Sequence, residues 1–337
     1  MNSWKKTGGS LLTLAAVCLA AVLVFRDHYQ EILENLRRVP GYGALALFAL
    51  AVVFQLLESG VCAALVRARL PSFSFWEAME VTFLGVFGNV ATFAVGSIPM
   101  QCLHLHRSGL SVGHGAGLMT VEYIFHKSSI LLYASVMLLF QGGWLRKTAP
   151  ELSRYLLPGY GICIVIVGAL VLVCTWAWLK NLVLHLIGLF PETEKWEKRK
   201  ASWRSNLESL YEETRNVLKS PACCGRILLL NGGKLLCLYS AAYLSVRLTG
   251  AADLPFWRVQ LLASLMLVIA SALPNVAGVG PAEFTFLMIF GRYMDYAQAS
   301  AALILYRAAT YFFPFAASIL FTFRVQRRSW AQNSSGE

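Results

Sequence analysis

Charged residues are scarce in this sequence. They make up 14% of the 337 residues, while apolar residues make up 57%, and a soluble chain is about one quarter charged. So little charge cannot cover the surface of a soluble fold, which excludes an ordinary soluble enzyme and a disordered protein. The apolar residues come in blocks long enough to cross a bilayer. The sequence therefore predicts a polytopic, all-α integral membrane protein.

Metal-binding and catalytic signatures are also missing. The sequence contains no CxxC pair, no HExxH and no P-loop, so neither a zinc site nor a nucleotide-hydrolysing centre is indicated. His104 and His106 are two residues apart and would not face each other on a helix. We expect no cofactor, no metal and no enzymatic activity.

Positive charge exceeds negative charge, with 29 Lys and Arg residues against 18 Asp and Glu. No nucleic-acid-binding module accompanies the excess, so we expect no nucleic-acid partner. The basic residues collect at the ends of apolar blocks, where they hold loops in the cytoplasm and contact anionic head groups. This pattern predicts a multi-pass protein of the cytoplasmic membrane whose partners are membrane lipids.

Residues 1–337 are expected to form a single membrane domain with about eight transmembrane helices and two broken segments. Repeat-like halves lie at about 41–180 and 224–325, and a basic amphipathic segment at 190–221 joins them. We interpret 11–25 as an uncleaved first helix rather than a signal peptide. A polar loop is expected at 146–154. The apolar blocks are 11–25, 41–66, 76–94, 115–140, 155–179, 226–246, 256–273 and 297–323.

The two broken segments resemble each other. Each has an Asn-Val-Ala run, a glycine-rich turn, a proline and then a polar side chain. In the first these positions are Asn89, Gly96, Pro99 and Gln101, and in the second they are Asn275, Gly280, Pro281 and Glu283.

Proline suits the first turn of a helix, and glycine permits a tight backbone before it. We therefore expect Pro99 and Pro281 to open half-helices at re-entrant breaks within a probable inverted repeat. Broken helices in two related halves indicate a transporter site. The alternative is two ordinary Gly/Pro hairpins.

Several ionisable residues lie inside apolar blocks, where they are costly and commonly functional or paired. Glu122 and His126 share a helical face, Lys127 adjoins them, and Lys234 and Arg307 lie in later blocks. Arg307 could instead form a structural pair with Glu283 or Glu122, and Lys127 could extend to the interface. The predicted substrate-binding residues are Arg307, Glu283, Gln101, Glu122, Lys127, Lys234, Asn89, Asn275 and Tyr311.

Two motifs, one around each break and in the same order along the chain, resemble those of the lysylphosphatidylglycerol synthase transmembrane region, also called the flippase-like domain family. The first runs over residues 87–101 and continues at 109–112. The second runs over 274–283 and continues through Arg307, Tyr311 and Pro314. The resemblance implies a lipid translocase fold with about eight spans and re-entrant helices.

In multiple peptide resistance factor proteins this region is joined to a cytosolic synthase domain. The present sequence ends about a dozen residues beyond the last apolar block, so we expect no synthase domain and no lysyl-lipid synthesis.

The preferred hypothesis is a lipid flippase that passes a phosphate-bearing phospholipid or polyprenyl lipid through a polar cavity at the half-helices. Basic groups would receive the phosphate while the tails stay in the bilayer. The alternative is a non-transporting partner subunit of a separately encoded lipid-modifying synthase or glycosyltransferase, docked through 190–221. A membrane enzyme would need a nucleophile or a metal site, and neither is evident.

Overall fold

The computed structural model describes residues 29–92, 95–188, 194–250, 253–273 and 279–334. Helices dominate this part of the chain, and five stretches in it are long and apolar enough to cross a membrane. The all-α membrane class is therefore confirmed, whereas eight crossings stay a prediction and segment 11–25 lies outside the described residues. The five stretches are Gly41–Val66, Val112–Thr148, Pro150–Thr175, Pro221–Leu248 and Tyr296–Arg328.

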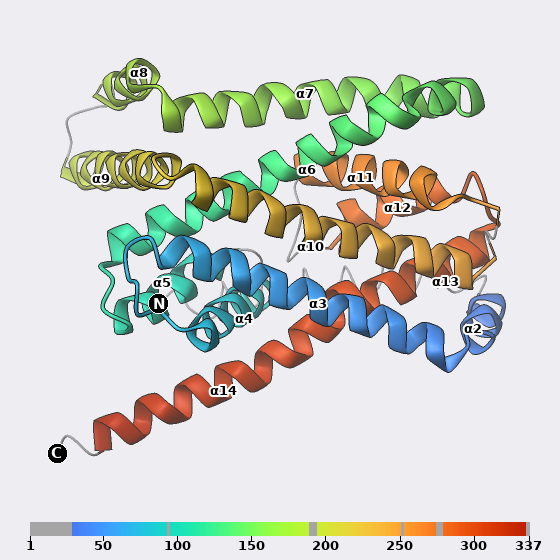
Figure 1. Ribbon diagram of the computed structural model, residues 1–337, viewed down its shortest axis with the longest axis horizontal. Coiled ribbons are helices and arrows are strands. Elements are labelled where there is room, and N and C mark those ends of the chain that lie inside the picture. Colours follow the sequence, from blue (N-terminus) through green and yellow to red (C-terminus); the bar gives the residue numbers. More distant parts are fainter. Residues whose placement is uncertain (1–28, 93–94, 189–193, 251–252, 274–278, 335–337) are drawn as a thin grey trace.

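Long helices lie along the long axis of the molecule, and shorter helices fill both ends (Figure 1). The largest interface joins α3 to α10, and α6 packs against α9, α11, α5 and α7. The elements are α2 (Tyr29–Arg37), α3 (Gly41–Val66), α4 (Phe75–Ala91), α5 (Ser97–Arg107), α6 (Val112–Thr148), α7 (Pro150–Thr175), α8 (Ala177–Gly188), α9 (Glu194–Leu218), α10 (Pro221–Leu248), α11 (Phe256–Ala272), α12 (Pro281–Phe290), α13 (Tyr296–Arg307), the π turn η2 (Ala308–Phe312) and α14 (Phe313–Ser334).

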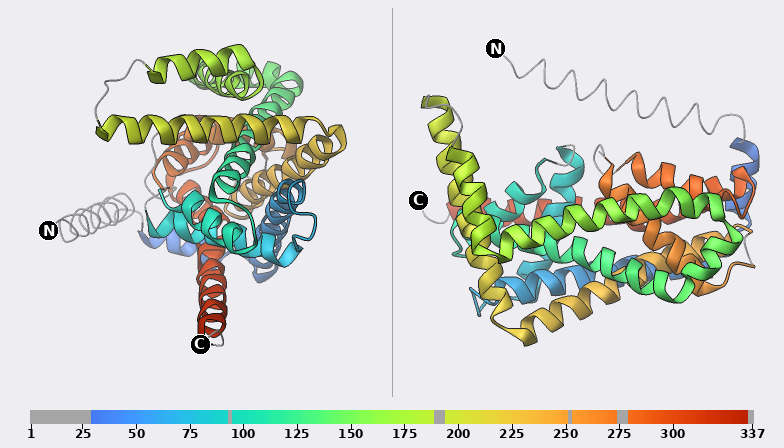
Figure 2. Two further views of the ribbon diagram at one scale, coloured as in Figure 1. Left: turned by 90° about the vertical axis from the view of Figure 1, so that its left-hand side faces the viewer. Right: turned by 90° about the horizontal axis from the view of Figure 1, so that it is seen from above.

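One order of elements occurs twice: a long helix, a helical hairpin, and a second long stretch. The first copy is α3, the first hairpin α4–α5, and α6. The second copy is α10, the second hairpin α11–α12, and α13–α14. Helices α3 and α10 run in opposite directions, and the hairpins enter from opposite ends (Figure 1). Their inner ends both lie near the middle of the molecule (Figure 2).

Small residues bring the two arms of the first hairpin together. A Cβ added at Gly88 would lie 2.5 Å from the carbonyl oxygen of Gly96, so the backbones touch at this point. The Thr92 hydroxyl donates to the Gly88 carbonyl at 2.7 Å and accepts from the Gly96 N–H. The sequence break at Gly96 is thus a tight helix-to-helix turn.

Substituting Gly88 tests this close approach. We expect Gly88→Ala to force α4 and α5 apart and to destabilise the protein by about 1–3 kcal/mol, as overpacking does elsewhere. Gly143→Ala in α6 is the matched control, because nothing lies within 4 Å of the added Cβ and alanine favours a helix. Thermal unfolding in detergent measures both. Equal melting temperatures for the two variants would contradict the proposed steric contact.

Glycine and proline also open the second hairpin's outgoing arm. Gly280 has φ of 108°, a conformation that only glycine adopts without strain. Pro281 is the first residue of α12, as predicted, and Glu283 folds back so that its Oε2 accepts the Gly280 N–H at 2.6 Å. This carboxylate satisfies a backbone donor that would otherwise be unpaired.

Two boundaries differ from the sequence expectations. The polar loop expected at 146–154 is wrong, because α6 continues to Thr148 and α7 begins at Pro150, with one residue between them. The charged side chains of this segment lie on the end of α6 and the start of α7. Pro150 is the first residue of α7, a position that suits proline. In the first hairpin, α5 begins at Ser97 with Gly96 as its N-cap. Pro99 is therefore the third residue of the half-helix and not its first.

The segment expected at 190–221 contains α9, which is firmly packed. Glu213 is 1% exposed, and its carboxylate accepts from the His114 Nδ1 at 2.6 Å and from the Arg69 Nε at 3.1 Å. Arg69 also binds Glu212, and this hydrogen bond lowers the pKa of that carboxyl. The contacts fix α9 across α6 and the end of α3.

Candidate functional site

An ion pair joins the second hairpin to the last long stretch. The Arg307 Nη2 lies 2.5 Å from the Glu283 Oε1, and both side chains are largely shielded from solvent. The Arg307 guanidinium also lies 4.5 Å from the ring centroid of Tyr311. Of the two partners considered for Arg307, the structure places Glu283 in contact. One Glu283 carboxylate therefore engages both the start of α12 and the cation.

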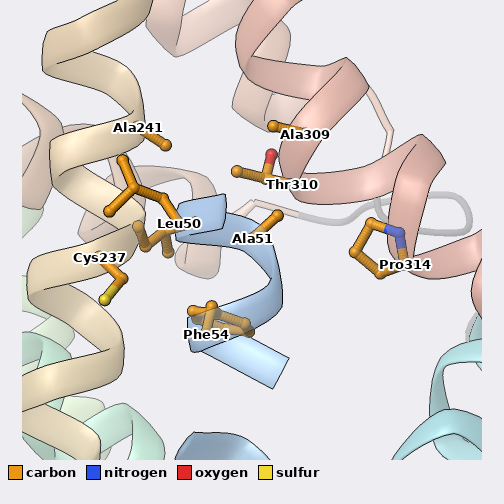
Figure 3. A pocket seen from close by; sticks show the side chains of 9 residues that line it. Leu50, Ala51, Phe54, Cys237, Ala241, Ala309, Thr310 and Pro314 are labelled. Carbon is orange, nitrogen blue, oxygen red and sulfur yellow. The ribbon is translucent and has the colours of Figure 1, made fainter. Parts of the chain in front are cut away.

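The helix widens into a π turn directly after Arg307. Pro314 has no N–H to donate, and its ring would clash with the carbonyl of Thr310 in a regular helix, which explains the wider turn. Isolated π turns are frequent at functional sites. Thr310 and Pro314 line a small apolar pocket with side chains of α3 and α10, including Phe54 (Figure 3).

The column α13–η2–α14 contacts both hairpins. Arg307 reaches Glu283 of the second hairpin, and Phe315 stacks on Phe87 of the first with ring centroids 6.4 Å apart. Eight residues separate Arg307 from Phe315, which is about 12 Å of helix rise. The inner ends of both hairpins are therefore connected through a short length of one helix.

A second ionic group lies between α3, α6 and α10. The Lys234 ammonium is fully buried and paired with the Glu58 carboxylate. Glu122 is 9% exposed and close enough to both for electrostatic interaction. Lys234 and Glu122 thus lie together but apart from the Arg307 pair. Sequence analysis noted Lys234 but missed Glu58 as its partner.

Lys127 lines an apolar groove of about 650 Å³ between α6, α7 and α11. The other walls include Ile166 and Leu170 of α7 and Val268 near the inner end of α11. The Lys127 ammonium lies 5.3 Å from the centroid of Tyr123, and the described part of the chain gives it no carboxylate within 4 Å.

The remaining predicted residues lie at the hairpins' inner ends or outside the described residues. Gln101 packs against α4, where a Cβ at Gly85 would lie 2.6 Å from its Nε2. Asn89 is partly exposed near the end of α4, and Asn275 falls outside the described ranges. No cluster of three or more possible metal ligands occurs in the residues with assigned positions.

Comparison with known proteins identifies one family. The family described as "Lysylphosphatidylglycerol synthase TM region" matches residues 11–318, which includes both hairpins and Arg307. No curated protein matches the chain.

Proposed function

Since the chain belongs to the lysylphosphatidylglycerol synthase transmembrane-region family, we propose that it is a lipid flippase of the cytoplasmic membrane. It moves a phosphate-bearing phospholipid or polyprenyl lipid between leaflets and leaves the lipid chemically unchanged. The two hairpins act as re-entrant segments of an inverted repeat, and their inner ends form the translocation site. Opposed directions of α3 and α10 support this arrangement, which is common in transporters.

The observation that carries the proposal is the groove at Lys127. Its walls are apolar, so an acyl or polyprenyl tail fits there, and its ammonium has no carboxylate partner in the described chain. A cation at this depth is costly unless something neutralises it. A lipid phosphate would supply the missing negative charge while the tail fills the groove.

Glu283 acts as the gate of the polar site. Its carboxylate occupies the two groups that a phosphate would seek, namely the start of α12 and Arg307, because helix N-termini and guanidinium groups both bind phosphate. An arriving phosphate competes with Glu283 and releases α12 from the last long stretch.

Arg307 and Lys127 lie near opposite arms of the second hairpin and are the two phosphate ligands. Lys234 is excluded from this role in the present conformation because Glu58 holds it.

The orientation follows from charge. The end of α3, helix α9 and the end of α14 lie at the same end of the molecule (Figure 1). Arg67 and Arg69 directly follow α3, and α14 contains Arg324 and Arg328. The positive-inside rule assigns this end to the cytoplasm. The other end, with the α2 helix and the α6–α7 junction, then faces outward.

Substituting Lys127 tests the groove. Vesicles are made with purified protein and phosphatidylglycerol or polyprenyl phosphate carrying a dithionite-quenchable label, and quenching reports exchange between leaflets. We expect Lys127→Met to slow exchange by roughly tenfold, the value of one charge-assisted hydrogen bond. Lys180→Met is the matched control, because Lys180 also contacts an aromatic ring, Tyr211, but does not line the groove. Wild-type vesicles that exchange neither lipid would contradict the flippase assignment.

The partner-subunit alternative predicts a different result. The outer face of α9 is largely exposed and carries Arg199 and Arg204, so a separate enzyme could dock there. In that case the purified protein exchanges no lipid, and reversing the charge of both arginines abolishes co-purification of the enzyme. Exchange by the purified protein alone decides for the flippase.

A further inference from the structure

Four ionisable side chains meet inside the membrane-spanning part, away from the Arg307 pair. Glu58 lies on α3, Glu122 and His126 on α6, and Lys234 on α10, and the three helices pack together. Lys234 is 0% exposed and Glu122 is 9% exposed. Glu122 and His126 are one turn apart on the same face of α6, so their side chains are neighbours.

The charges of this group do not balance unless a proton is bound. Two carboxylates share one ammonium, and Glu58 holds that ammonium directly. With His126 neutral and both carboxylates ionised, a net negative charge would be buried, which is strongly unfavourable. One proton on Glu122 makes the group neutral. On the same three helices, three buried polar atoms have no hydrogen-bond partner in the described structure, namely the Gln55 Oε1, the Asn231 Oδ1 and the His126 Nδ1.

In the described part of the chain, the charged groups that act on Glu122 are Glu58 and Lys234. Cys62 on α3 and Lys127 on α6 are the other titratable groups near the cluster, and the Lys127 ammonium is directed to the groove. On α9, Glu213 is held by Arg69 and His114. Glu122 is therefore the carboxyl without a cation of its own.

We propose that Glu122 is a proton-binding site whose occupancy is coupled to lipid in the Lys127 groove. The coupling rests on the proposed function, whereas the bound proton does not. Helix α6 carries the coupling, because it holds both the proton site and a wall of the groove. Lys127 follows His126 directly, so a small rotation of α6 moves the proton site and the groove together.

Infrared spectroscopy of the protein in phosphatidylcholine nanodiscs tests the proton directly. We expect a protonated-carboxyl band at neutral pH that disappears in Glu122→Gln. Glu151→Gln is the matched control, because Glu151 forms an exposed pair with Arg292, and it should leave the band intact. Absence of the band from the wild-type spectrum, or its persistence in Glu122→Gln, overturns the site.

Coupling is measured by titrating the same band with and without phosphatidylglycerol. Because linkage is reciprocal, lipid that binds in the groove must change proton affinity, and roughly a tenfold change is expected. Lys127→Met in the same nanodiscs is the control for the surface potential of the anionic lipid, because this variant meets the same bilayer surface but lacks the cation of the groove. An identical lipid-induced change in both proteins removes the coupling but leaves the proton site. If the band behaves as expected but the protein exchanges no lipid in vesicles, the proton site stands and only the flippase function is contradicted.

Discussion

Replacing Arg307 by alanine is expected to reduce lipid exchange on the order of a hundredfold while the protein still folds. Charge-assisted hydrogen bonds contribute about 1.5–3 kcal/mol each, and Arg307 is the cation within reach of the second hairpin's carboxylate. Glu283 keeps its bond to the Gly280 N–H, so α12 retains its start. The quenching assay on reconstituted vesicles gives the rate, and size-exclusion chromatography reports the fold.

Two further variants separate a binding role from a structural one. Arg307→Lys retains the charge but loses the planar fork that binds phosphate at two points, so partial activity is expected. Arg292→Ala removes an exposed pair with Glu151, which contributes little, and should exchange lipid normally. Normal exchange by Arg307→Ala would show that the site is placed wrongly.

Lys234→Met is expected to give the largest loss of stability. It leaves the Glu58 carboxylate without its buried partner, and removing one member of a buried pair costs about 3–5 kcal/mol. Glu58 is 25% exposed, so the lower end of that range applies. Thermal unfolding in detergent, followed by tryptophan fluorescence, measures the change.

The matched rescue is the double variant Lys234→Met with Glu58→Leu. Replacing both members of a buried pair by apolar side chains is often neutral, so this protein should unfold close to the wild-type temperature. A single variant as stable as the wild type would contradict the structural importance of the pair. A stable double variant that no longer exchanges lipid would assign the pair to function as well.

Local sequence signals predicted much of the fold. The helix at Gly41–Val66 has the predicted bounds, and each break falls between the two described helices of a hairpin. These features depend on apolar length and on the backbone properties of glycine and proline, which act within a few residues. The loop expected at 146–154 was wrong for a different reason. The charged residues there continue α6 beyond its apolar part, so polarity alone did not mark the end of the helix.

The candidate site was predictable only in part. Arg307 and Tyr311 lie one helical turn apart, so their contact followed from spacing. The choice between Glu283 and Glu122 as partner of Arg307, and the pairing of Glu58 with Lys234, depend on which helices pack together. Residues 58 and 234 are brought together by the α3–α10 interface, and nothing in the local sequence specifies that register.

The π turn after Arg307 sets the rotation of α14 relative to α13. A π turn holds one residue more than a regular helical turn. The Pro314 ring opposes a tighter turn, so the wide turn is the resting state. An α-helical turn there would rotate α14 by about 100° and move it about 1.5 Å along its axis. That screw motion would pull apart the stacked rings of Phe83 and Phe321 and the bond from Arg328 to Glu80. Displacement of Glu283 by a lipid at the centre of the molecule would then be transmitted to the far end of α14 by rotation of that helix.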